Sequence, residues 1–299
     1  LKAAAAKLRQ AGRAGAAAFA TVARLDGAFG LAELSPEADP TAGGLAGMAK
    51  TARHEWPEVS CRALDLSPAF GDPAAAAAAV VEEVLASGPP EVGISPTHRC
   101  TVELARTARR PHSQLINLGP RDVILVTGGA RGVTAEVAVA LAETYSSTLV
   151  LTGRTPAPAA EPAYLAGLTG EAEMKKALAD ALGSGGTPKA VGELYKKAVA
   201  QREVRATLDR VGATGAKVAY FPVDITDGRA VADLLHQVRV KFGPVTAVVH
   251  GAGVLADKRI EDLTGDGFDA VYATKVDGLR TLLDLLGSEE LKALVLFSS

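Results

Sequence analysis

Apolar and polar residues follow each other along this chain in blocks that predict an α/β fold. Short apolar runs rich in β-branched residues, typical of strands buried on both faces, alternate with longer stretches in which apolar residues recur at helical spacing. In the second half we expect strands at residues 123–126, 148–151, 217–223, 245–250 and 291–297. We expect helices there at residues 134–143, 227–241 and 267–286. This alternation is typical of a parallel sheet covered by helices.

The first half of the chain shows the same alternation. We expect helices at residues 1–14, 43–55 and 73–87, and strands at residues 17–25, 60–66, 91–94 and 100–104. A polar and basic stretch, residues 105–119, is a candidate linker. We therefore predict two Rossmann-like, doubly wound α/β subdomains, residues 1–119 and residues 120–299.

A glycine-rich turn joins the strand at residues 123–126 to the helix that follows it. Glycine lets a pyrophosphate approach main-chain N–H groups, and the N-terminus of the helix adds its own N–H groups and dipole. A strand, glycine turn, helix and strand in this order predict a dinucleotide site. The residues expected to bind the cofactor there are Thr127, Gly128, Gly129, Arg131, Gly132 and Val133. A tight turn without a ligand is the alternative, and the first subdomain has no such turn.

The end of the second strand indicates which dinucleotide is bound. In NAD enzymes an acidic residue near this point contacts the ribose hydroxyls. This chain carries Arg154 there, with no Asp or Glu until Glu161. A guanidinium suits a 2′-phosphate, so we expect NADPH over NADH, with Arg131 as a second positive contact. The alternative is that Arg154 is a solvated loop cation.

Residues 156–213 are longer than a plain crossover between parallel strands requires. Apolar residues recur there at helical spacing over residues 171–182, 190–200 and 202–211. We predict an inserted helical hairpin on the surface of the second subdomain, and a disordered linker is the alternative.

Composition narrows the class of protein. The chain has 299 residues, of which 48% are hydrophobic and 22% charged, so it is expected to be globular. A net charge of −2 argues against binding nucleic acid, and the alanine run at residues 74–79 is too short to span a membrane. Two cysteines, Cys61 and Cys100, cannot form a disulfide framework, which favours a reducing, cytoplasmic compartment. The chain does not begin with Met, so we expect it to be a piece of a longer protein.

Residues 54–56, His-Glu-Trp, invite a catalytic interpretation. No nucleophile or metal-spaced partner accompanies them, so we expect a helix end at which Trp56 anchors the packing. His98 and His112 also lack metal-ligand spacing, and no metal site is expected.

The motifs together resemble the short-chain dehydrogenase/reductase superfamily, in particular the ketoreductase domains of polyketide synthases and polyunsaturated fatty acid synthases. The motifs are residues 127–134, 224–225, 250–253, 275–278 and 297–299. Residues 43–47 and 54–57 resemble the noncatalytic structural half of such ketoreductases, so the resemblance covers nearly the whole chain. The insertion resembles that of the polyunsaturated fatty acid synthase branch.

The resemblance implies how a cofactor would be held. Asp224 would accept a hydrogen bond from the adenine amino group, with Ile225 beside the ring. Gly251, Ala252 and Gly253 would let the backbone approach the nicotinamide ribose. Thr134 stands where the family usually has its last glycine, which would tighten the space beside the cofactor.

The resemblance also implies catalytic roles. Lys275 would be the active-site lysine that lowers the pKa of a proton-donating tyrosine, and Ser299 would donate a hydrogen bond to the substrate carbonyl. Asp257 matches the aspartate of B-type ketoreductases, which implies a D-configured 3-hydroxyacyl product. None of the five tyrosines begins a Tyr-x-x-x-Lys or Tyr-x-x-x-Asn pattern, and Tyr272 lies three residues before Lys275. We therefore expect a chain truncated at the active-site serine, or an inactive one.

The activity implied is NADPH-dependent reduction of a 3-ketoacyl thioester on an acyl carrier protein, beside the other domains of a megasynthase. Two other functions stay open. One is a catalytically silent nucleotide-binding module that serves as a structural or docking element. The other is a free-standing short-chain dehydrogenase, against which the N-terminal half argues.

Overall fold

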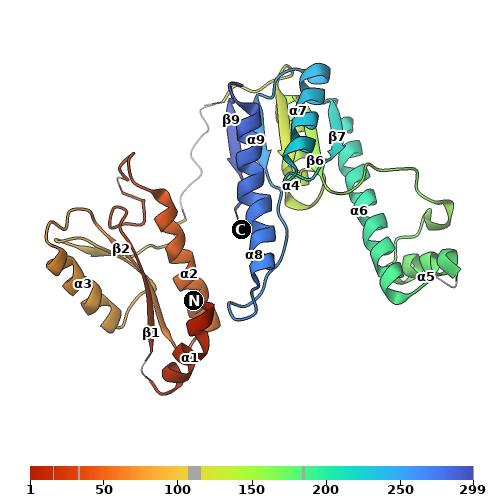
Figure 1. Ribbon diagram of the computed structural model, residues 1–299. Coiled ribbons are helices and arrows are strands. Elements are labelled where there is room, and N and C mark those ends of the chain that lie inside the picture. The colour runs from red at the N-terminus through yellow and green to blue at the C-terminus, as the bar shows by residue number, and fades with distance from the viewer. Residues whose placement is uncertain (16, 33, 107–115, 184–185, 299) are drawn as a thin grey trace. The chain divides into compact units, whose positions relative to one another are not determined.

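A computed structural model describes residues 1–15, 17–32, 34–106, 116–183 and 186–298 (Figure 1). The chain divides into two compact units. The first comprises Leu1–Pro111 together with Asp257–Thr264, and the second comprises His112–Ala256 together with Gly265–Ser299. A short segment from far along the chain thus belongs to the first unit, which no local pattern indicated. The assignment of a structural and a catalytic role to residues 1–119 and 120–299 stays a prediction.

The first unit contains a four-stranded sheet in the order β1-β2-β3-β4. The strands are β1 Ala18–Ala23, β2 Ser60–Leu66, β3 Glu91–Ile94 and β4 Arg99–Cys100. β1, β2 and β3 pair in parallel, and β4 pairs antiparallel with β3. The strand expected at residues 100–104 is wrong in extent, because only Gly93 and Ile94 offer partners to β4.

Helices cover both faces of this sheet (Figure 1). The helical segments are 3₁₀ turns at Lys2–Ala4 and Pro40–Gly43, and helices α1 Ala5–Arg13, α2 Gly44–Glu55 and α3 Pro73–Leu85. On one face, Trp56 and Cys61 pack with residues of α1 and α2, and on the other, Leu64 and Val92 pack with α3. Trp56 is fully buried, so its predicted packing role is confirmed.

The second unit is built on a five-stranded sheet in the order β7-β6-β5-β8-β9, with every pair parallel. The strands are β5 Val123–Thr127, β6 Thr148–Gly153, β7 Val218–Pro222, β8 Ala247–His250 and β9 Ala293–Leu296. The strand order reverses between β5 and β8, which is the point where doubly wound sheets bind ligands. The predicted α/β class with a Rossmann-like parallel sheet is confirmed.

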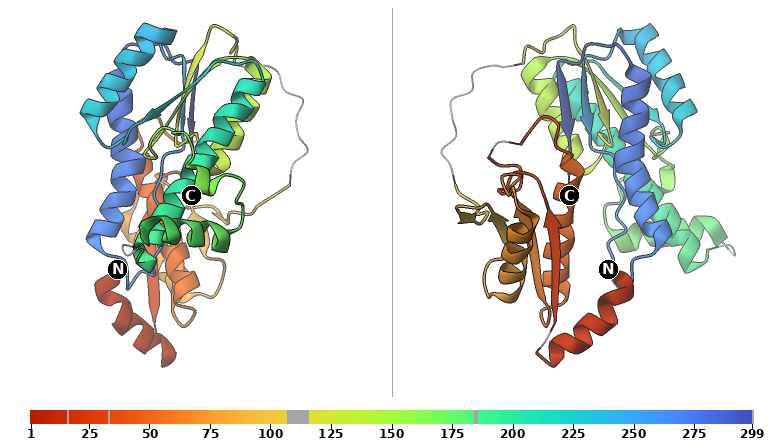
Figure 2. Two further views of the ribbon diagram at one scale, coloured as in Figure 1. Left: turned by 90° about the vertical axis from the view of Figure 1, so that its right-hand side faces the viewer. Right: turned by 60° about the vertical axis from the view of Figure 1, so that its left-hand side comes forward.

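In the described part of the second unit, helices pack on both faces of the sheet. They are α4 Gly132–Tyr145 and α6 Pro188–Ala213 on one face, and α7 Gly228–Phe242 and α9 Gly278–Leu286 on the other. α4 and α6 lie side by side in Figure 2, and α5 Glu171–Leu182 packs against α6. A 3₁₀ turn at Ala163–Leu165 precedes α5.

The segments expected to be helical at residues 190–200 and 202–211 are both helical, and they form one continuous helix, α6. Gln201, at the predicted boundary, is a good helix former, and neither Gly nor Pro stands next to it. Val204 and Val211 are fully buried against the sheet. The second half of α6 therefore forms the crossover helix between β6 and β7. The first half of α6 packs with α5 instead of with the sheet.

The single helix expected at residues 267–286 is interrupted. It consists of α8 Gly265–Tyr272, a π-helical turn Ala273–Asp277 and α9. Such turns occur often at functional sites, and this one contains Lys275. In the described part of the chain, no helix is both long and apolar enough to cross a membrane.

Candidate cofactor and active site

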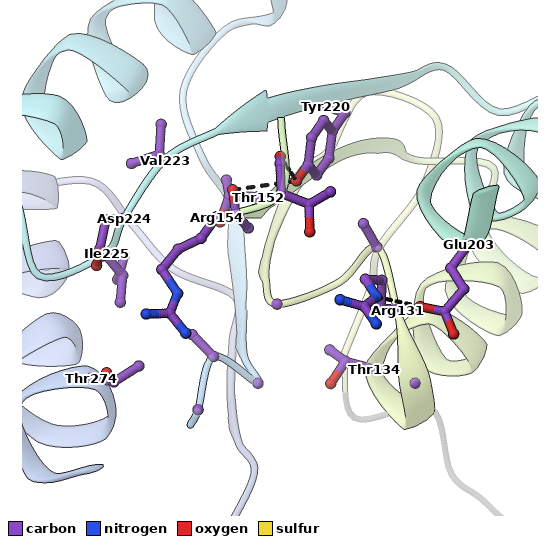
Figure 3. A pocket seen from close by; sticks show the side chains of 18 of the residues that line it. Arg131, Thr134, Thr152, Arg154, Glu203, Tyr220, Val223, Asp224, Ile225 and Thr274 are labelled. Carbon is purple, nitrogen blue, oxygen red and sulfur yellow. Dashed lines mark hydrogen bonds and ion pairs between the residues drawn. The ribbon is translucent and has the colours of Figure 1, made fainter. Parts of the chain in front are cut away.

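A cavity of about 550 Å³ lies at the carboxyl ends of β5, β6, β7 and β8 (Figure 3). Its walls come mainly from the segments that directly follow these strands. They are the glycine turn from Gly128 to Gly132, residues 152–155, residues 223–225 and residues 251–253. Parallel strands bring their carboxyl ends to one edge, so segments distant in sequence meet here, beside the reversal of strand order.

The glycine turn has a conformation that side chains would oppose. Gly128 and Gly132 have φ values of +70° and +60°, in the left-handed region that favours glycine. A Cβ atom added at Gly128 would lie 2.8 Å from the carbonyl oxygen of Gly251. Arg131 at the N-cap of α4 offers no side-chain acceptor to the first turn, which leaves N–H groups there for a ligand or water.

Most of the predicted cofactor residues meet in this cavity. Gly128, Arg131, Gly132, Arg154, Asp224, Ile225, Gly251, Ala252 and Gly253 line it. Thr127, Gly129 and Val133 do not line it, because Thr127 is buried at the end of β5 and Val133 is exposed on α4. A Cβ at Gly129 would lie 2.5 Å from Cγ1 of Val126, so this glycine serves the packing of the turn.

The two arginines have different surroundings. Arg131 forms an ion pair with Glu203 of α6, whereas Arg154 is exposed and lies on the side of the cavity that carries Asp224 and Ile225 (Figure 3). The pKa of Asp224 is lowered, first by the backbone N–H of Thr226 and further by its hydroxyl and the charge of Arg154. Asp224 is therefore an ionised acceptor beside a guanidinium.

Thr134 and Gly251 fit closely together. Thr134 is buried, and its Oγ1 and Cγ2 atoms would lie 2.5 and 2.6 Å from a Cβ added at Gly251. The threonine thus fills the space beside the main chain after β8, and only glycine fits at position 251.

His250 connects the sheet to the turn that carries Lys275. Its Nε2 lies 3.0 Å from the carbonyl oxygen of Lys275, and its Nδ1 lies 2.9 Å from Oγ1 of Thr127. A carbonyl oxygen only accepts, so Nε2 carries the hydrogen and the Thr127 hydroxyl donates to Nδ1. The Thr127 oxygen also accepts from the N–H of Ala252 at 3.2 Å. Burial lowers the pKa of His250, which keeps the ring neutral in this role.

The predicted catalytic residues differ in how close they lie to the cavity. Cε of Lys275 lies 3.3 Å from the position of a Cβ at Gly253, which lines the cavity, although Lys275 is not itself among the lining residues. Asp257 is not among the residues that line the cavity and begins the segment that packs in the first unit. Ser299 lies outside the described residues. Tyr272 stacks on Phe268, with ring centroids 5.8 Å apart.

Several cavity residues were missed from the sequence. They include Thr152, Thr155, Glu203, Tyr220 and Thr274. Thr152 and Thr155 flank the end of β6, so the rule that ligands bind beyond strand ends would have found them. Glu203 stands in a helix 72 residues from its partner Arg131, and no local signal indicates this pairing.

Comparison with known proteins places this chain in a family. The family model described as KR domain matches residues 123–299. One of the subunits of the polyunsaturated fatty acid synthase of Thraustochytrium sp. (strain ATCC 26185 / S-3) is 33% identical over 303 residues, which cover 95% of this chain and 11% of that protein.

Two solved ketoreductase structures match nearly the whole chain. A structure of A-type ketoreductases from a modular polyketide synthase matches with a TM-score of 0.66 at 25% identity, and one of an A1-type ketoreductase matches with 0.65 at 26%. Each match covers 99% of this chain and 53% of the other, so the chain spans about half the length of these structures. The KR domain family comprises the ketoreductase domains of polyketide and polyunsaturated fatty acid synthases. These domains are oxidoreductases of the short-chain dehydrogenase/reductase superfamily, and they use a nicotinamide cofactor. This chain therefore belongs to the KR domain family.

Proposed function

We propose that this chain reduces 3-ketoacyl groups, carried on an acyl carrier protein, with NADPH within a megasynthase. The observation that carries the proposal is the cavity beyond the strand ends, which combines a glycine turn at a helix N-terminus with a lysine-bearing π-helical turn. The neighbouring domains and the carrier protein are part of the proposal, since the chain covers only 11% of its curated relative.

The cavity residues fit a phosphorylated dinucleotide. The main-chain N–H groups near Gly132, at the first turn of α4, suit a diphosphate, and the positive end of the α4 dipole adds to them. Arg154 suits the 2′-phosphate, because a guanidinium gains little from a free hydroxyl. Asp224 and Ile225 lie on the same side as Arg154, where the adenine would bind (Figure 3).

Catalysis would rest on the charge at Lys275. The cofactor, when bound, supplies a hydride to the β-ketone, and negative charge then grows on the carbonyl oxygen. A cation beside the site stabilises that charge and lowers the pKa of a proton-donating hydroxyl. The hydrogen bond from His250 to the Lys275 carbonyl fixes the backbone of the turn from which the lysine extends. Ser299 would donate a hydrogen bond to the same oxygen.

Asp257 supports a proposal about stereochemistry. By its resemblance to the aspartate of B-type ketoreductases, it would direct the substrate so that a D-configured 3-hydroxyacyl product forms. Chiral chromatography of the product tests this proposal. A product of L configuration would contradict it.

Binding and turnover test the function together. The whole protein that carries this chain is titrated with NADPH and with NADH, and the same is done for Arg154→Ala and for Arg210→Ala. Arg210 is a matched control, because it pairs with Glu136 and does not line the cavity. We expect Arg154→Ala to weaken NADPH binding about 10- to 100-fold and to leave NADH binding nearly unchanged. Equal affinities throughout would contradict the NADPH assignment. NADPH binding without reduction of any 3-ketoacyl thioester would instead favour the silent nucleotide-binding module.

A further inference from the structure

The hydroxyl group of Tyr220 binds the main chain on both sides of Arg154. Tyr220 Oη donates to the carbonyl oxygen of Thr155 at 2.6 Å and lies 3.3 Å from the carbonyl oxygen of Gly153 (Figure 3). A hydroxyl has one hydrogen, so the shorter contact is the principal bond and the longer one a weaker second branch. A side chain of β7 thus contacts the carbonyl groups just before and just after a predicted cofactor residue.

These carbonyl groups lie where the ladder between β6 and β7 ends. Gly153 and Pro222 are the last partners in that ladder, and Arg154 and Thr155 follow β6 outside any helix or strand. Gly153 leaves room for the hydroxyl, because a Cβ there would lie 3.3 Å from Tyr220 Oη. The Tyr220 side chain therefore extends the link between the two strands two residues beyond the end of β6.

The ring of Tyr220 is held by packing. Tyr220 pairs with Leu151 across the two strands, and its ring packs against the buried cluster that contains Leu151 and Val204 of α6. Phe221, the next residue, packs against the cluster on the opposite face of the sheet, as the alternation of a strand requires. The core thus fixes the direction in which the hydroxyl points.

The Tyr220 hydroxyl remains a donor near neutral pH. Burial raises the pKa of Tyr220 above its ordinary value, and the charge of Arg131 offsets this effect only in part. The hydroxyl therefore keeps its hydrogen, and Tyr220→Phe removes one donor without altering the charge of the cavity.

The guanidinium of Arg154 depends on this backbone for its direction. It lies on the side of the cavity that carries Asp224 and Ile225 (Figure 3). The Arg154 side chain is exposed, so packing constrains it little. The direction in which the side chain leaves the main chain is then set by the backbone angles of Arg154, between the two carbonyl groups that Tyr220 contacts.

We propose that Tyr220 is a positioning residue that fixes the backbone around Arg154 and thereby sets the preference for NADPH over NADH. This inference rests on the proposed function, in which Arg154 binds the 2′-phosphate. With the hydroxyl bond in place, the segment from Gly153 to Thr155 presents the guanidinium in one direction, so little conformational freedom is lost when the phosphate binds. Without that bond the segment samples more conformations, and a smaller fraction of them is competent to bind the phosphate.

The test uses variants that separate the hydroxyl from the guanidinium. Tyr220→Phe keeps the ring in its cluster and removes the bond to the Thr155 carbonyl. Arg154→Ala removes the guanidinium, and a double variant combines the two changes. Tyr195→Phe is the matched control, because the Tyr195 ring packs under Lys175 in the insertion and is not among the residues that line the cavity.

The wild type and these variants are titrated with NADPH and with NADH, each as the whole protein. Tyr220→Phe is expected to weaken NADPH binding about 3- to 10-fold and NADH binding less than about twofold, as for the loss of one hydrogen bond that serves the phosphate alone. In the Arg154→Ala background, Tyr220→Phe should change NADPH affinity less than about twofold, because no guanidinium remains to be positioned. Tyr195→Phe should match the wild type with both cofactors.

A measurement without cofactor tests the positioning step by itself. Trypsin cleaves after Arg154 only when this segment moves away from its folded conformation, and mass spectrometry follows the cleavage at that bond. We expect cleavage about 3- to 10-fold faster in Tyr220→Phe than in the wild type or in Tyr195→Phe. Unchanged cleavage would contradict the positioning role.

The titrations distinguish failure of this inference from failure of the proposed function. An unchanged ratio of NADPH to NADH affinity in Tyr220→Phe would overturn the inference and leave the proposed function intact. An equal loss of NADPH binding with and without Arg154 would also overturn it, since the hydroxyl would then act on the cofactor directly. If the wild type and Arg154→Ala bind both cofactors equally well, the NADPH assignment fails, and this inference fails with it.

Discussion

The close fit between Thr134 and Gly251 predicts a strong interaction between these two positions. In Gly251→Ala the new methyl group would lie 2.5 Å from Oγ1 and 2.6 Å from Cγ2 of Thr134, about 1 Å inside ordinary contact distance. Thr134 is buried in α4 and Gly251 follows β8, so the overlap is relieved only by moving one of these elements. Overpacking of this kind lowers the free energy of unfolding by about 1–3 kcal/mol.

Shortening the threonine should remove most of that cost. In Thr134→Ala the nearest remaining atom of residue 134 would be its Cβ, 3.1 Å from the new methyl group, which requires a shift of only a few tenths of an ångström. We therefore expect Gly251→Ala to cost less than about 1 kcal/mol in the Thr134→Ala background, a coupling of about 1–2 kcal/mol.

A double-mutant cycle measured by urea denaturation checks this prediction, with NADPH affinity measured for the same four proteins. Gly253→Ala is a suitable control, because its methyl group would meet only the flexible end of Lys275, at 3.3 Å, and should cost little stability. The reasoning is refuted if Gly251→Ala costs the same free energy in both backgrounds.

Three further predictions follow from the contacts of the second unit. His250→Phe removes the donor to the Lys275 carbonyl, and we expect a loss of about 1–3 kcal/mol in unfolding free energy and a lower kcat, with NADPH affinity nearly retained. Glu203→Gln leaves Arg131 without its ion-pair partner, so NADPH affinity should rise about 2- to 10-fold, as fluorescence titration would report. Burial alone would raise the pKa of Asp122, but the hydrogen bonds from Lys292, Thr246 and Gly119 lower it overall. The pKa of Asp122 in the folded protein thus lies below its unfolded value of 3.8. The contribution of Asp122 to the free energy of unfolding is therefore complete above pH 3.8 and is lost as the pH falls through the folded pKa. Lys292→Met should therefore reduce stability by about 1 kcal/mol above that pH and less in acid, as denaturation at several pH values would show.

The sequence predicted the features that depend on local rules. Gly128 and Gly132 lie between a strand and a helix, and Arg154 and Asp224 each follow a strand, so their positions at one edge of a parallel sheet follow from topology alone. The family and the α/β class were predicted correctly for the same reason, because motif order and the alternation of elements are both readable along the chain.

The features that the sequence did not predict depend on contacts between distant segments. Nothing within residues 259–263 indicates that Glu261 meets Arg9 and Trp56. The π-helical turn at Ala273–Asp277 was also missed, because helical periodicity continues through it. Its carbonyl contact with His250 is visible only once β8 and this turn are placed together.

The surroundings of the two arginines bear on which of them selects the cofactor. From their charge alone, Arg131 and Arg154 would be expected to contribute equally to the selection of NADPH. In the structure, Glu203 already compensates the charge of Arg131, and Thr207 of the same helix donates to the carbonyl oxygen of Ala130 at 2.9 Å, so α6 holds this part of the glycine turn. A phosphate would have to compete with Glu203 for Arg131. Arg154 lies near Asp224, whose Oδ1 already accepts two hydrogen bonds from Thr226, so discrimination between NADPH and NADH should depend mainly on Arg154.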